Sequence, residues 1–331
     1  MTQPDRSSMR ASGADSGPGL PRRPLGGTGL EVTRVCIGGA PLGSMPENFG
    51  YEVSADQAVA TVQHVLASAV NFLDTSNDYG SGRSEERIGR ALAAAGGLPR
   101  GFVLATKVDP DPSTGQFDAA RARESAAESL GRLGLDRFQL LYLHDPEVIS
   151  FDEAMGPGGA VEGLAALRDE GIAEHIGVAG GPVGLLQRFI RTGLFEVLIT
   201  HNRFTLVDRS ARELIDEAAE AGIGVVNGAP YGGGILARGP AHTSFYGYRR
   251  ASDEVLRRIG RMEQLCAEYG VPLRAAALHA SLRNPNISST IVGTATIPHV
   301  EELVGLAQTD MPDELFAQLD ELAAPRDEWL W

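Results

Sequence analysis

Short apolar runs alternate with amphipathic segments along most of the chain. Eight of these runs have the length and aliphatic, β-branched composition of buried strands. They cover residues 35–37, 71–74, 102–107, 139–143, 176–178, 196–200, 224–227 and 290–292. We therefore predict eight strands that are separated in sequence by longer segments.

The separating segments carry apolar residues at helical spacing. The clearest begins with a capping-box pattern, Ser54 followed by Gln57, and its apolar face then carries Val59, Val62, Val65 and Leu66. Another is predicted to start after Ser84, with two glutamates in a first turn that favours negative charge. Further helices are predicted over 118–134, 158–171, 183–192, 209–221, 254–268, 272–283 and 298–306.

Eightfold alternation of strand and helix predicts an α/β fold, a parallel (β/α)8 TIM barrel. A doubly wound open sheet is the alternative, but its first turn would carry the Gly-x-Gly-x-x-Gly spacing, which residues 38–43 lack. Residues 22–33, with glycines in their turns, predict a hairpin that could close the bottom of the barrel. We expect a disordered tail over 1–20 and one barrel domain over 21–331.

Composition narrows the possible partners. The formal net charge of −14 argues against binding to nucleic acid or to an anionic membrane surface. No run approaches the ~18 apolar residues that a membrane-spanning helix needs. Cys36 and Cys266 lie far apart in apolar settings, so we expect reduced core thiols and a cytoplasmic protein.

Four side chains that can relay protons or charge follow consecutive predicted strands. Asp74 ends the second strand, Lys107 ends the third, and His144 follows the fourth; Tyr79 lies five residues after Asp74. Lys107 is the single lysine among 29 basic residues. Each could have a structural role alone, as a turn cap, a half-buried anchor or a loop histidine. Because active sites of such barrels lie at the C-terminal ends of the strands, we expect the four to meet there.

The chemistry of these four groups is coherent. The buried ammonium of Lys107 needs a counter-charge, which Asp74 can supply. A nearby cation favours the phenolate, so we expect Lys107 to lower the pKa of Tyr79 from about 10. His144 can orient the same substrate oxygen. The spacing shows neither a metal site nor a Ser-His-Asp triad, and proton transfer at a carbonyl or carbinol oxygen implies a nicotinamide cofactor.

Residues 71–89, 104–107, 129–136 and 141–146 together resemble the motifs of the aldo-keto reductase superfamily, and the similarity extends from about residue 22 to the C-terminus. The resemblance implies a (β/α)8 barrel, an NAD(P) cofactor and a catalytic tetrad. By this match Tyr79 is the general acid/base, Lys107 and Asp74 tune it, and His144 orients the substrate.

The resemblance also implies a set of cofactor contacts. Carried over position by position, they fall on Gly39, Asp74, Ala179, His201, Asn202, Ala229, Pro230, Tyr231, Gly232, Gly293, Thr294, Ala295, Thr296, His299 and Glu302. The chain departs from the family where many members have Ser-Asn after strand five and an aromatic residue after strand seven; it has residues 177–180 and Gly228 there. Between Gly293 and Glu302 there is no lysine or arginine to hold a 2′-phosphate, so NAD is expected in preference to NADP.

Residues 202–206 and 227–236 resemble the sugar dehydrogenases of this superfamily, such as L-fucose (D-threo-aldose) and L-galactose dehydrogenases. The expected reaction is oxidation of an aldose, a small-molecule substrate, to its lactone. The alternatives are a pyridoxal 4-dehydrogenase, an NADPH-dependent aldehyde or ketone reductase, and a non-catalytic cofactor-sensing regulatory subunit. Residues 44–52, 145–153, 231–250 and 329–331 are the expected substrate-shaping loops. Neither the oligomeric state nor the physiological direction follows from the sequence.

Overall fold

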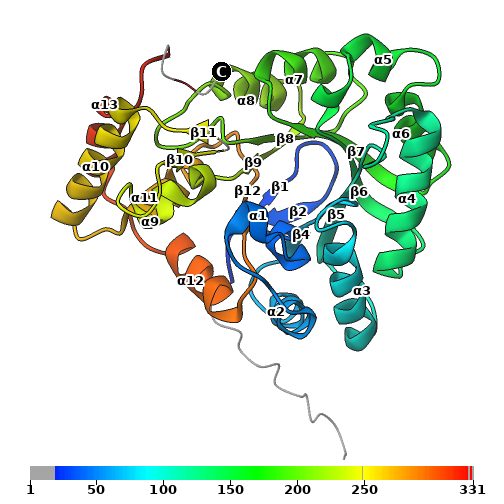
Figure 1. Cartoon of the computed structure of the whole chain (residues 1–331), viewed down its shortest axis with the longest axis horizontal. Helices are drawn as coiled ribbons and strands as arrows, with labels where there is room; N and C mark the ends of the chain where they lie inside the picture. The colour runs from blue at the N-terminus through cyan, green and yellow to red at the C-terminus, as the bar shows by residue number, and fades with distance from the viewer. Residues whose placement is uncertain (1–18, 248, 327–328, 330–331) are drawn as a thin grey trace, which may run out of the picture.

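The computed structural model describes residues 19–247, 249–326 and 329, and its centre is a closed barrel of eight parallel strands (Figure 1). The order around the barrel is β12-β3-β4-β5-β6-β7-β8-β9. The strands are β3 (Val35–Gly38), β4 (Phe72–Asp74), β5 (Val103–Val108), β6 (Phe138–His144), β7 (Ala173–Gly180), β8 (Val197–His201), β9 (Gly224–Gly228) and β12 (Ser289–Gly293). The predicted (β/α)8 barrel is confirmed, with each strand at its expected place.

Helices surround the barrel as a ring (Figure 1). The long ones are α2 (Ala55–Leu66), α3 (Arg83–Ala95), α4 (Ala119–Leu133), α6 (Ala160–Asp169), α7 (Val183–Ile190), α8 (Arg212–Glu220), α10 (Asp253–Glu268), α11 (Leu273–Leu282), α12 (Ile297–Ala307) and α13 (Asp313–Glu321). All except α13 match predicted helices. The loops also contain α1 (Pro46–Phe49), α5 (Phe151–Met155), α9 (Ile235–Arg238), the 3-10 turns η1 (Ala40–Gly43), η2 (Pro146–Val148) and η3 (Gly232–Gly234), and the small hairpin β10 (Phe245–Tyr246) with β11 (Arg249–Arg250).

Two details of the predicted helix starts need correction. The Ser54 side chain accepts from the backbone of Gln57 as expected, but the Gln57 amide donates to the Ala295 carbonyl instead of completing the capping box. Helix α3 begins at Arg83, so Ser84 lies inside it, and its hydroxyl donates to the Gly39 carbonyl. In both places, the side chain that was expected to cap the helix, Gln57 or Ser84, instead forms a hydrogen bond with a residue far away in the sequence.

The strand residues alternate between two apolar clusters. Val103, Ala105 and Tyr142 belong to the cluster inside the barrel, whereas Leu104 and Leu141 belong to the larger cluster between strands and helices. This alternation follows from the two-residue period of a strand, and it decides which polar residues at the strand ends face inward.

The strands β1 (Arg22–Pro24) and β2 (Glu31–Thr33) form the expected hairpin. Leu25 and Val32 of this hairpin join the interior cluster, and Gly27 donates a backbone hydrogen bond to Gly222, just before β9. At Gly26 (φ +57°) an added Cβ would lie 2.2 Å from the Gly224 nitrogen, so only glycine allows this approach. The hairpin therefore closes the N-terminal end of the barrel, as the sequence suggested.

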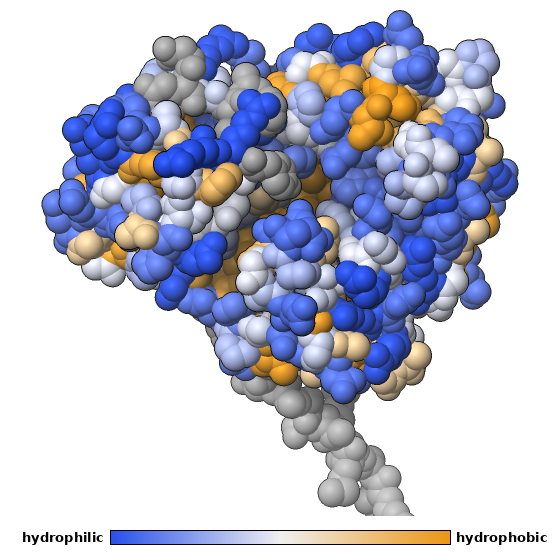
Figure 2. All heavy atoms as spheres, in the orientation of Figure 1, coloured by the Kyte–Doolittle hydropathy of each residue, from blue (hydrophilic) through white to orange (hydrophobic). Residues whose placement is uncertain are grey.

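Both cysteines are buried and free. Among the described residues no helix is long and apolar enough to cross a membrane. Most of the tail predicted over 1–20 lies outside the described residues. In Figure 2 the visible face is hydrophilic over most of its area, and hydrophobic side chains are seen in a hollow near its middle.

Candidate active site

Strand register brings the predicted polar residues to the inner side of one end of the barrel. Lys107 continues the inward positions of Val103 and Ala105, and His144 continues those of Leu140 and Tyr142. Asp74 follows inward-facing Phe72 in the same way. All three stand at or beside the C-terminal ends of neighbouring strands, where barrel enzymes place their reactive groups.

Lys107 is at the centre of this group. Its ammonium donates to Asp74 Oδ1 at 2.6 Å, to the Thr75 carbonyl at 2.6 Å and to the Tyr79 hydroxyl oxygen at 3.2 Å. These three acceptors use all three donor positions of an ammonium group, and the side chain is only 2% exposed. Burial alone would lower the pKa of Lys107, but the Asp74 carboxylate and Tyr79 oxygen raise it, so the group stays charged.

The loop that carries Tyr79 is fixed from two sides. The Asn77 amide donates to the Ser125 carbonyl of α4 at 3.0 Å, and Arg132 of the same helix donates to the Asn77 carbonyl at 3.0 Å. Next to Tyr79, an added Cβ on Gly80 (φ +63°) would lie 2.2 Å from the Gly43 carbonyl oxygen. This position therefore requires glycine both for its backbone conformation and for the close approach of the loop after β3.

Lys107 lowers the pKa of Tyr79 as predicted, but the sequence analysis did not foresee the larger, opposite effect of burial. Desolvation raises the pKa of Tyr79 above its ordinary value, and the Lys107 ammonium opposes that rise without reversing it. The phenol is therefore protonated in the free protein, and Lys107 limits how far its acidity falls. The ring of Tyr79 also meets the edge of His144, with centroids 5.6 Å apart and an interplanar angle of 80°.

Two groups behind His144 were missed by the sequence analysis. The ring Nδ1 lies 2.5 Å from Asp109 Oδ1 and 2.9 Å from the Ser76 hydroxyl. The signal that could have found them is spacing, because Ser76 and Asp109 each lie two residues after an inward-facing group, Asp74 and Lys107. Burial alone would lower the pKa of His144, but the Asp109 and Asp145 carboxylates raise it to about 8.

The other side of the rim, after β7 and β8, is built from small and polar residues. An added Cβ on Gly181 would lie 3.3 Å from Glu147 Oε1 and 3.4 Å from a His201 ring carbon. A carboxylate oxygen of Asp145, a carboxylate oxygen of Glu147 and a ring nitrogen of His201 all lie within 4.8 Å of one another. The buried Asn202 Oδ1 has no hydrogen-bond partner among the described residues. The predicted cofactor residue Ala179 adds a buried position on β7 to this group of small and polar residues.

Left-handed backbone conformation is concentrated in the loops at this end of the barrel. The positive-φ residues other than glycine among those described are Ser44, Ser81, Asp145, Asn202 and Ala229. Each lies in a loop that follows a strand of the barrel. Such conformations cost of order 1–3 kcal/mol in non-glycine residues and gather at functional sites.

The remaining predicted cofactor residues also lie at this end. Gly39 follows β3 and donates its backbone N–H to the Asp74 carbonyl at 2.7 Å. Ala229, Pro230, Tyr231 and Gly232 form the turn after β9, and Gly293, Thr294, Ala295 and Thr296 lead from β12 into α12, which Thr296 caps. His299 and Glu302 lie in the first turns of α12, and Glu302 pairs with Arg274 at 2.7 Å.

Comparison with known proteins gives this site a family. The model of the aldo/keto reductase family matches residues 34–324. The chain belongs to the aldo/keto reductase family. It is 32% identical to L-galactose dehydrogenase of Arabidopsis thaliana, in an alignment that covers 93% of this chain and 96% of that protein. It is 30% identical to D-threo-aldose 1-dehydrogenase of a Pseudomonas species, in an alignment that covers 88% of this chain and 94% of that protein. An aldo-keto reductase from Bacillus halodurans, solved in its holo form, superposes with a TM-score of 0.75 at 23% identity over 93% of this chain and 99% of that one.

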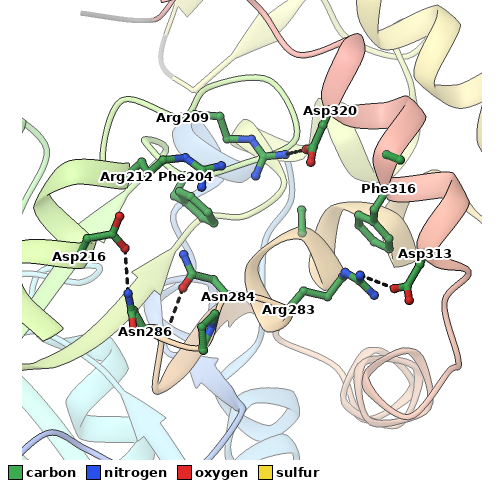
Figure 3. A pocket seen from close by; sticks show the side chains of 13 residues that line it. Phe204, Arg209, Arg212, Asp216, Arg283, Asn284, Asn286, Asp313, Phe316 and Asp320 are labelled. Atoms are coloured by element: carbon green, nitrogen blue, oxygen red, sulfur yellow. Dashed lines mark hydrogen bonds and ion pairs between the residues drawn. The ribbon is translucent and has the colours of Figure 1, made fainter.

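This aldo/keto reductase has a second hollow, outside the barrel. A cavity of about 430 Å3 lies between α8, α11 and α13 (Figure 3). Most of its charged side chains pair with one another or with polar neighbours: Arg209 with Asp320, Arg283 with Asp313, and Asp216 with Asn286. None of the tetrad residues lines it. The chemistry of this family member is therefore to be sought at the strand ends.

Proposed function

We propose that this protein is an NAD(P)-dependent dehydrogenase that oxidises the hemiacetal carbon of a free aldose to a lactone, with NAD as the preferred cofactor. The observation that carries the proposal is the buried ammonium of Lys107, which contacts both Asp74 and Tyr79 beside the ring of His144. The two aldose-oxidising relatives named above support the substrate class.

The residues on the β8 side fit a nicotinamide nucleotide. The buried Asn202 Oδ1, directly after β8, is an acceptor without a partner among the described residues, and such an atom suits the polar edge of a carboxamide. The loop from Gly293 to Thr296 leads into the N-terminus of α12, which favours an anion such as a diphosphate. When bound, a nicotinamide ring supplies the hydride acceptor that alcohol oxidation requires.

In the proposed mechanism Tyr79 exchanges a proton with the substrate oxygen. For oxidation, the substrate hydroxyl gives its proton to the tyrosine oxygen, which must first be deprotonated. Lys107 stabilises that phenolate through the 3.2 Å contact, and Asp74 keeps the ammonium in place at 2.6 Å. His144 binds the same substrate oxygen and fixes its orientation.

Charge around α12 supports NAD over NADP. A 2′-phosphate needs cationic partners, and Arg274, which contacts this helix, is already paired with Glu302 at 2.7 Å. The exposed Glu301 adds further negative charge. An extra phosphate would therefore meet two carboxylates and only a shared guanidinium.

A second candidate is oxidation of an alcohol with an aromatic ring, of the kind that pyridoxal represents. Tyr51, Val148 and Phe245 are exposed, and they belong to loops that follow β3, β6 and β9. Exposed apolar side chains at this end of a barrel favour a substrate with an apolar part.

The test is a panel of L-fucose, L-galactose, pyridoxal and a simple aldehyde, each measured with both cofactors in both directions. The proposal predicts the highest kcat/KM for an aldose with NAD, with lactone as product. A higher value for pyridoxal would select the second candidate. Cofactor binding without turnover of any substrate would contradict both and favour a cofactor-sensing role.

A further inference from the structure

The carboxylate of Asp109 contacts the Nδ1 side of the His144 ring, and both of its oxygens accept hydrogen bonds. Its Oδ1 lies 2.5 Å from the ring Nδ1. Its Oδ2 accepts from the Ser76 hydroxyl and, at 3.0 Å, from the backbone N–H of Asp78. Because an ionised carboxylate cannot donate, the ring nitrogen that faces it must carry the hydrogen.

The position of this carboxylate is itself determined by α4. The backbone N–H of Asp109 donates to the Ser125 hydroxyl at 3.0 Å, and Arg121 Nε donates to the Asp109 carbonyl at 3.1 Å. The residue is only 4% exposed. A buried carboxylate is costly unless it is paired and hydrogen-bonded, so this one is stable because of the ring and the two donors at Oδ2.

We propose that Asp109 is a positioning residue for His144, which fixes its Nδ1–H form and holds the ring as an imidazolium at neutral pH, so that Nε2 presents a charged N–H to the substrate oxygen. As a role in catalysis this rests on the proposed function. Its structural part, the charge and tautomer of His144, does not.

Other charges around the ring act in both directions. Asp145, directly after His144, has a carboxylate oxygen 3.8 Å from Nε2 and also favours the imidazolium. Lys107 of β5 disfavours the imidazolium, and desolvation of the ring disfavours it more strongly. Asp74 of β4 and Asp78 lie within electrostatic range, and Tyr79 meets the ring edge. Asp109 is the group that combines full charge, burial and a direct bond to the ring.

The sign of the pH effect follows from the raised pKa of His144. With a pKa of about 8 the ring is mostly charged at pH 7, and Nε2 loses its hydrogen as the pH rises through that value. The ion pair also stabilises the folded state below about pH 6.5, the ordinary histidine value, and this contribution disappears above about pH 8.

The test is NMR titration of His144 in the protein without substrate. The chain has seven histidines, and the His144 signal is the one lost in His144→Gln. We expect a midpoint well above 6.5 in the wild type and a midpoint lower by about 1–3 pH units in Asp109→Asn, which removes the charge and keeps the shape. The matched control is Asp78→Asn, which removes an exposed carboxylate two residues from Ser76 that is not hydrogen-bonded to the ring; it should move the midpoint much less.

Several results would overturn the proposal. These are a wild-type midpoint at or below about 6.5, an unchanged midpoint in Asp109→Asn, or an equal shift in Asp78→Asn. The first needs no variant, so it decides the question even if Asp109→Asn fails to fold. With an active substrate from the panel, the alkaline limb of the carbonyl-reduction profile should move to lower pH in Asp109→Asn. An unmoved limb would reject the catalytic role, whereas failure of the panel leaves the titration result valid.

Discussion

The two halves of the barrel rim are built in opposite ways. At the ends of β4, β5 and β6, which we call the charged half, charged side chains bond to one another, as Lys107 does with Asp74 and His144 does with Asp109. The ends of β7, β8 and β9, which we call the open half, carry fewer charged side chains: β7 and β9 end in Gly180 and Gly228, and the buried Asn202 Oδ1 after β8 lacks a partner among the described residues.

The difference separates catalysis from binding. Donors and charges that are held in place before substrate arrives need no reorganisation during the reaction, which is the main source of electrostatic catalysis. Unpartnered buried acceptors are costly in the free protein and become satisfied when a ligand supplies donors. The first half is therefore complete without ligand, apart from Asp74 Oδ2, Asp145 Oδ1 and the Tyr142 hydroxyl, and we expect a ligand to complete the second half at Asn202. Substitutions in the first half should change kcat, and those in the second should change cofactor affinity.

The largest effect is expected from Tyr79→Phe, which removes the proton-transfer group and leaves the ring in place. Loss of a general acid/base lowers kcat by about 10²–10⁴-fold. The dissociation constant of the cofactor, measured by quenching of protein fluorescence, should change little because Tyr79 lies on the charged half of the rim. Turnover near the wild-type value would reject the assignment of Tyr79.

Lys107→Arg should have the next largest effect although it preserves charge. The ammonium is 2% exposed and all three of its donors are used, whereas a planar guanidinium is wider and presents its donors as a fork. We expect kcat to fall by about 10²-fold, since a misplaced donor no longer stabilises the phenolate. The excess volume should also lower the stability by about 1–3 kcal/mol, measurable by denaturant unfolding. Normal turnover with a normal unfolding curve would show that charge alone is sufficient.

The sequence predicted the charged half better than the open half. Asp74, Lys107 and His144 are at strand ends, and strand position follows from apolar periodicity, so their convergence could be predicted. Even there, Asp109 was missed because the predicted strand ended at residue 107, and the rise in the pKa of Tyr79 was missed because desolvation depends on packing that spacing does not show. In the open half, the loop conformations depend on long-range contacts. The approach of Glu147 to Gly181 and the pairing of Arg274 with Glu302 join segments far apart in sequence.

The smallest effect should come from Asn202→Gly in the open half. This change removes the amide, whose Oδ1 is unpartnered and whose Nδ2 lies 3.2 Å from His201 Nδ1. It also places glycine at φ +58°, a conformation that glycine adopts without strain. The unfolding free energy should change by less than about 1 kcal/mol, because relief of backbone strain offsets the greater freedom of glycine in the unfolded chain.

The cofactor measurement then tests the comparison between the halves. Loss of one neutral hydrogen bond of about 0.5–1.5 kcal/mol should weaken cofactor binding in Asn202→Gly by roughly 2- to 13-fold, with kcat at saturating cofactor nearly unchanged. Ser81→Gly is the matched control, since Ser81 has the same left-handed backbone (φ +56°) but follows β4 in the charged half. Its cofactor affinity should equal that of the wild type. Equal weakening in both variants would mean that loop stiffness, and not the Asn202 amide, determines cofactor affinity, and the open half would then have no specific role for this side chain.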